Sequence, residues 1–170
     1  MNNINSALLG ETPTRFTLDS REATRDVIAA MTGQARRSLA VFTPDLNKFL
    51  YDQQAFVDAV RQLVTSRRGA LIRVLVKDSS RAAAEGHRLI NLAQRLSSFI
   101  HFRTPPEDYA EYHEAFLIAD TSGVVHQAQA DRFKGWACFH APLEARRLRT
   151  FFDEVWQNSA PDSRLRRLSV

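Results

Sequence analysis

The fold is decided by residues 111–120, which read Glu111-Tyr112-His113-Glu114-Ala115-Phe116-Leu117-Ile118-Ala119-Asp120. Residues 115–119 form an apolar run of strand length, preceded closely by a histidine and followed by an aspartate. Thr121-Ser122-Gly123 then indicates a tight turn into a second strand at 124–128. We expect two neighbouring strands, with polar side chains at both ends of the first.

Outward from this segment, helices and strands alternate. Asp19 or Ser20 is a good helix cap, and Gly69 is a typical helix end. Helices are expected after that cap, at 53–66, at 80–96 and from Pro142 or Leu143 onward, and further strands at 38–43, 70–76, 99–102 and 136–139. The nearly unbroken apolar run at 70–76 is typical of a strand covered on both faces, as in a parallel sheet. This order predicts a layered α/β domain.

The organisation of the chain is simple. Its 170 residues, 44% of them hydrophobic, suffice for one core. We expect a loose N-terminal arm at 1–18, a single domain at 19–158 and a polar basic tail at 159–170, which carries Arg164, Arg166 and Arg167.

Charge and cysteine content narrow the classes of function. The chain has 23 Lys+Arg against 19 Asp+Glu, and only Lys48, Lys77 and Lys134 are lysines. Arginine suits bidentate contacts to phosphate, but a net charge of +4 is modest and favours ordinary solvated helix faces over a nucleic-acid footprint. The single cysteine, Cys138, excludes a disulfide framework and predicts a reducing, cytoplasmic setting. No apolar run is long enough to predict a membrane span.

The motif and the order of elements together resemble one half-unit of the phospholipase D superfamily, from about Asp19 to Asn158. That family carries the signature HxKxxxxD. Here His113 and Asp120 have the family's spacing, while Ala115 occupies the lysine position. The resemblance implies a phospholipase D-like layered α/β sandwich, with a mixed sheet of about six to seven strands flanked by helices.

The resemblance also implies a chemistry. In the family the histidine attacks a phosphodiester to form a phosphohistidine, the lysine neutralises the phosphate oxygens, and the aspartate orients the structure around the histidine. Active enzymes bring two motifs together, and this chain holds one. An active form would therefore be a homodimer with two His113 side chains facing each other across a twofold axis.

Several departures from the family's pattern argue against catalysis. Loss of the cation at position 115 typically costs on the order of 100- to 1,000-fold in rate. Residues 126–131 lack the family's Gly-Ser-x-Asn turn, and four carboxylates crowd the approach to His113, namely Glu107, Asp108, Glu111 and Glu114. Arg132 and Lys134 are the candidate replacement cations, and His126 is a further candidate ligand-binding residue.

Other site classes fit poorly. His113-Glu114 begins an HExxH-like string, but Leu117 stands where the second histidine is needed. Cys138 lies between apolar residues and is expected to be a small core residue rather than a zinc ligand or nucleophile. We expect neither a metal nor a cofactor.

The leading hypothesis is a catalytically degenerate phospholipase D-like domain that serves as a binding or accessory module. Its ligand would be a phosphate-containing molecule or nucleic acid held by Arg132, Lys134 and His126, with His113 and Asp120 vestigial. One alternative is an active homodimeric phosphodiesterase or nuclease that uses His113 as nucleophile. Another is a structural dimerisation domain. The degenerate motif favours a protein that is not an enzyme.

Overall fold

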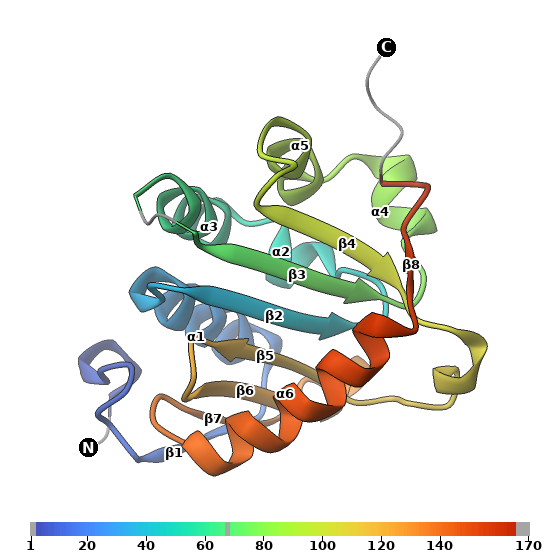
Figure 1. The fold of residues 1–170 in the computed structure, drawn as a ribbon. Coiled ribbons are helices and arrows are strands. Elements are labelled where there is room, and N and C mark those ends of the chain that lie inside the picture. Colours follow the sequence, from blue (N-terminus) through green and yellow to red (C-terminus); the bar gives the residue numbers. More distant parts are fainter. Residues whose placement is uncertain (1–2, 67–68, 166–170) are drawn as a thin grey trace.

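One mixed sheet organises the chain (Figure 1). The computed structural model describes residues 3–66 and 69–165. Within these residues the sheet has eight strands in the order β1-β7-β6-β5-β2-β3-β4-β8. They are β1 (Arg15–Leu18), β2 (Ser38–Thr43), β3 (Leu71–Val76), β4 (Ile100–Thr104), β5 (Ala115–Ala119), β6 (Gly123–Gln129), β7 (Lys134–Cys138) and β8 (Ala160–Pro161). Strands β2, β3 and β4 are parallel to one another, and all other neighbours are antiparallel.

Helices cover both faces of this sheet. Figure 1 shows α6 (Pro142–Gln157) across one face and α1 (Arg21–Gln34), α3 (Gln54–Ser66) and α5 (Arg88–Arg95) on the other. Two shorter helices, α2 (Lys48–Tyr51) and α4 (Ser80–Glu85), follow the ends of β2 and β3. The expected layered α/β fold is confirmed, with slightly more strands than predicted.

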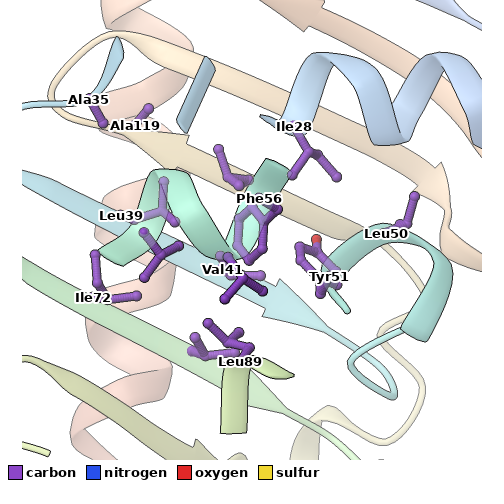
Figure 2. Close-up of a cluster of buried hydrophobic side chains, with 14 of the residues drawn as sticks. Ile28, Ala35, Leu39, Val41, Leu50, Tyr51, Phe56, Ile72, Leu89 and Ala119 are labelled. Carbon is purple, nitrogen blue, oxygen red and sulfur yellow. The ribbon is translucent and has the colours of Figure 1, made fainter. Parts of the chain in front are cut away.

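The core lies in two apolar clusters, one on each face of the sheet. Alternation along β5 sends Leu117 toward the α1 and α3 layer and Phe116 toward α6. Figure 2 shows the first cluster, in which the sheet residue Val41 and the helix residues Ile28 and Phe56 are labelled. Burying each such side chain stabilises the fold by about 1.5–3 kcal/mol. The apolar run at 115–119 is therefore explained by burial on both sides.

The expected bounds of 38–43 and 115–119 are confirmed, but the single helix expected at 80–96 is wrong. It is divided into α4 and α5 at Gly86, whose φ of 81° lies in the left-handed region that glycine tolerates best. His87 then begins a new helix, because its Nδ1 accepts a hydrogen bond from the Leu89 N–H at 3.2 Å.

The N-terminal segment is not loose over residues 3–18. Strand β1 pairs with β7, and the Leu9 N–H donates to Gln34 Oε1 at 2.7 Å. Residues of the expected C-terminal tail also pack on the domain, because Asp162 is buried and accepts hydrogen bonds from the Ser79 and Thr104 hydroxyls, both at 3.0 Å. Both segments are too short for a periodic signal, yet they pair with the sheet edges. Residues 1–2, and Arg166 and Arg167 of the expected tail, lie outside the described residues.

His87 gives stability a dependence on pH. Only 3% of this residue is exposed, and burial lowers the pKa of its imidazole below 6.5, although Asp52 and the Leu46 backbone raise it and Lys48 lowers it further. As the pH falls, the unfolded chain takes up the proton first. The contribution of His87 is thus fully present above about pH 6.5 and is lost as the pH falls through the folded pKa.

We expect wild type to lose more free energy of unfolding than His87→Asn when the pH falls from about 7.5 to about 5. Asparagine keeps a side-chain acceptor for the first turn of α5 but does not titrate. Urea unfolding of both proteins at both pH values measures the difference. Equal losses would show that His87 is not the group responsible.

Candidate functional site

Strand β5 begins at the edge of the sheet where the parallel strands β2 and β3 end (Figure 1). His113 lies two residues before the start of β5, at this edge. Its side chain is 70% exposed, and Glu111 Oε2 lies 3.6 Å from its Nε2. Its carbonyl oxygen accepts a hydrogen bond from the Ala130 N–H at 3.1 Å, which joins the start of β5 to the segment after β6. The backbone of His113 is therefore fixed, while its imidazole faces solvent.

Asp120 lies at the opposite end of β5. It is seven residues from His113, which is about 23 Å along an extended strand. Its carboxylate accepts hydrogen bonds from the N–H groups of Arg36 (3.1 and 3.0 Å), Arg37 (2.8 Å) and Ser38 (3.2 Å). Asp120 thus caps the junction between α1 and β2 and makes no contact with His113. The two motif residues lie beyond opposite ends of one strand and do not form one site.

Ala115, at the lysine position of the motif, is 2% exposed. Alternation places its side chain on the same face of β5 as that of Leu117, which packs in the α1 and α3 layer. The methyl group of Ala115 therefore supplies no positive charge near His113.

His126 is enclosed rather than open to a ligand. It lies on β6 opposite Phe116, and its side chain is 11% exposed. Its Nε2 lies 2.7 Å from Glu114 Oε1, and its ring stacks on Trp136 with the centroids 5.7 Å apart. The partner Glu114 belongs to the acidic group expected to face His113, but its carboxylate is engaged by His126.

Arg132 and Lys134 are both exposed, at the end of a short 3-10 helix (Ala130–Arg132) and at the start of β7. Ala130, at the start of that helix, is the residue that bonds to the His113 carbonyl. In the part of the chain that the structure describes, neither cation forms an ion pair within 4 Å. They lie at the same edge of the sheet as His113, on the surface.

Lys77, which follows β3, was not predicted from the sequence to belong to this edge. Its Nζ donates to the carbonyl oxygens of Ala110 (2.9 Å) and Tyr112 (2.7 Å), and so holds the segment that leads into His113. A lysine directly after a buried apolar strand was the available signal. Its ammonium is occupied by two backbone carbonyls, which limits its use as a phosphate-binding cation.

Tyr112, next to His113, is not an acid–base group at neutral pH. Its ring packs against Phe42 at 4.9 Å between centroids, and burial, helped by the charge of Glu114, raises the pKa of its phenol far above the ordinary value. The aromatic contact fixes this segment of the chain, and the imidazole of His113 is exposed beside it.

Three hollows of the molecule lie away from this edge. Three cavities, of about 800, 740 and 200 Å³, are lined by other residues than His113, Arg132 or Lys134. Within residues 3–66 and 69–165, no group of three or more His, Cys, Asp or Glu side chains is placed to hold a metal ion. No helix of that part is long and apolar enough to cross a membrane. The arrangement can offer an exposed imidazole and surface cations to an anion.

The topology defines a phospholipase D-like fold, and solved structures agree. The phospholipase D family member Nuc from Salmonella typhimurium has a TM-score of 0.58 at 13% identity, covering 88% of this chain and 98% of that one. The archaeal chromatin protein TrmBL2, whose structure shows a novel mode of DNA binding, has a TM-score of 0.62 at 14% identity, covering 89% of this chain. This chain spans only 55% of TrmBL2. Phosphatidylserine synthase of Haemophilus influenzae Rd KW20 has a TM-score of 0.59 at 13% identity, covering 93% and 41% of the two chains.

The family itself is shown by sequence. Residues 20–168 match the family described as Domain of unknown function (DUF7931), and the chain belongs to it. No curated protein matches the chain.

Proposed function

We propose that the chain is a phospholipase D-like domain that no longer cleaves phosphodiesters and binds a phosphate-containing ligand. The observation that carries the proposal is the surroundings of His113, which is 70% exposed and has a carboxylate, not a cation, 3.6 Å from its Nε2. The lysine position holds a buried alanine, and Lys77 is committed to two carbonyls.

Phosphoryl transfer needs fixed positive charge where negative charge develops in the transition state, and one preorganised donor is worth on the order of 100- to 1,000-fold. An arginine or lysine that only reaches the phosphate through solvent supplies far less, because it must be ordered during the reaction. Binding has weaker demands, since exposed cations attract phosphate without being held in one geometry.

The ligand that fits the edge best is a phosphodiester backbone. Arg132 and Lys134 are exposed beside the His113 backbone, and the archaeal chromatin protein with this fold binds DNA. Phosphate-bearing small molecules share the same chemistry, so the test must compare the two sources.

Binding of inorganic phosphate, single-stranded DNA and duplex DNA should be measured by fluorescence anisotropy or calorimetry over a series of salt concentrations. We expect Arg132→Gln and Lys134→Gln each to weaken DNA binding about 3- to 10-fold at low salt and to lower the salt slope by about 1. Arg95→Gln is the matched control, because Arg95 is exposed at the end of α5, near the opposite end of the sheet. Equal effects of all three substitutions would exclude a site at this edge.

An active homodimeric phosphodiesterase is the second candidate. It is favoured by the match over 98% of Nuc, a phospholipase D family member, and by the exposed His113 imidazole, which a second copy could approach. It requires a dimer at working concentration and a phosphohistidine at His113 that can be trapped. A monomer by light scattering would count against this candidate.

A further inference from the structure

A cavity of about 800 Å³ lies along the edge of β4. Strand β8 pairs with Arg103 and Thr104, and the Asp162 N–H donates to the Phe102 carbonyl at 3.1 Å, so the edge of β4 over residues 100–101 is not covered by a strand. On the α6 side the cavity is lined by Arg73, His101, Arg103 and Trp156, and on the α5 side by Ala93, Gln94, Ile100, Phe102 and Leu165. We call this space the β4 cleft. It is separate from the edge that carries His113.

Two guanidinium groups face the β4 cleft and are held in place by an aromatic stack. Arg103 lies 4.5 Å from the centroid of the Trp156 ring and donates from Nη1 to the Trp156 carbonyl at 2.8 Å. Arg73 lies 4.9 Å from the centroid of Phe152, which stacks on Trp156. Both guanidinium groups are therefore positioned before any ligand binds.

Hydrogen-bond donors in the β4 cleft are left without partners. A guanidinium has five N–H donors, and within the described residues Arg103 uses one of them. Arg73 forms an ion pair with Asp153, in which Nη1 lies 2.9 Å from Oδ1 but without hydrogen-bond geometry. Gln94 Nε2 is buried and has no hydrogen-bond partner in the part of the chain that the structure describes. A buried unpaired donor is costly and is typical of a place that a ligand acceptor completes.

Asp162 is the acidic residue in the wall of the cleft, and its carboxylate is not free to bind a cationic ligand. The Asp162 carboxylate already accepts from the Ser79 and Thr104 hydroxyls and from the N–H groups of Arg164 and Leu165. Apart from the Gln94 amide, the α5 side of the cleft is apolar, through Ile100, Phe102 and Leu165. Two guanidinium groups on one side and a mainly apolar surface on the other define the chemistry of an occupant.

We propose that the β4 cleft binds a small amphiphilic anion, in which an oxyanion group contacts Arg73 and Arg103 and a short apolar chain or ring lies along Ile100, Phe102 and Leu165. Phosphate monoesters and carboxylates share this chemistry. The site is independent of the function proposed for the His113 edge.

Octyl phosphate, octanoate, octanol and inorganic phosphate are the probes, each used below its micelle concentration where it has one. Binding to the full chain is followed by the emission of Trp156 in a Trp136→Phe background, which leaves one tryptophan, and by calorimetry. We expect octyl phosphate or octanoate to bind at least about 10-fold more tightly than both inorganic phosphate and octanol. Comparison of the first two probes identifies the preferred oxyanion. Equal binding of octanol and the two anions would overturn the proposal.

Variants locate the site. Arg73→Gln and Arg103→Gln should each weaken binding of the preferred anion by about 10-fold, whereas Arg95→Gln, on α5 but outside the cleft wall, should leave it unchanged. Asp153→Asn should tighten binding several-fold, because it releases Arg73 from its carboxylate partner. That gain separates a binding role from a structural one, since loss of a purely structural ion pair would weaken binding or leave it unchanged. Weakening of binding in Asp153→Asn, or equal loss in all three arginine variants, contradicts the proposal.

Discussion

Asp120→Ala is expected to lower the free energy of unfolding by about 2–3 kcal/mol. The carboxylate accepts from three consecutive backbone N–H groups at the start of β2, and removal leaves these donors without a protein partner. Alanine must also adopt the φ of 54° that Asp120 has, a conformation that aspartate and asparagine tolerate better. The expected loss is not larger, because the junction is partly exposed and water can replace some of the hydrogen bonds.

Asp120→Asn is the matched control for this change. Its amide oxygen can still accept at the Oδ1 position, which receives N–H groups from Arg36, Arg37 and Ser38, so we expect a loss of only about 1 kcal/mol. Urea unfolding of the three proteins gives the comparison. An Asp120→Ala protein as stable as wild type would remove the structural role assigned to this residue.

Gly135→Ala is expected to cost about 3 kcal/mol or more, and the protein is expected to fold poorly. Gly135 lies on β7 between β1 and β6. A Cβ placed there would lie 1.8 Å from the carbonyl oxygen of His126 and 2.9 Å from Gln127 Cα. Both atoms are backbone, so the strands themselves must separate next to the irregular pairing at 127–129.

Gly33→Ala is the opposite case and a useful control. Gly33 lies within α1, is exposed, and a Cβ there would meet no atom within 4 Å. We expect it to stabilise the protein by about 0.5–1 kcal/mol, because alanine favours the helix and restricts the unfolded chain. The unfolding temperatures of both variants, compared with that of wild type, test the two expectations. A Gly135→Ala protein with the same unfolding temperature as wild type would mean that β6 and β7 are not closely spaced at Gly135.

The elements that could be predicted from sequence are those with a long apolar pattern. The strand at 115–119 is buried on both faces, and α6 presents a stripe that includes Leu148, Phe152 and Val155, so each carries its own signal. Strands β1 and β8 have four and two residues and are defined by their partners β7 and β4, which sequence spacing does not reveal. The break at Gly86 was visible as a glycine but was outweighed by apolar residues that continue the helical period.

The candidate site was harder to predict because its contacts depend on register. His126 was expected to bind a ligand, yet the pairing of β5 with β6 places Glu114 beside it, and the two side chains satisfy each other. Asp120 has the spacing of a catalytic motif, but three backbone donors from a junction more than 80 residues earlier in the chain determine what it does. The role of Lys77 likewise depends on carbonyls more than 30 residues away.

The proposal that this domain has lost phosphodiesterase activity is tested most directly by turnover of a phosphodiester model substrate, measured side by side for wild type and His113→Ala. The exposed imidazole, the buried Ala115 and the engaged Lys77 predict that the two proteins give the same rate, equal to that of buffer. Wild-type turnover that disappears in His113→Ala would contradict the account and establish an active enzyme.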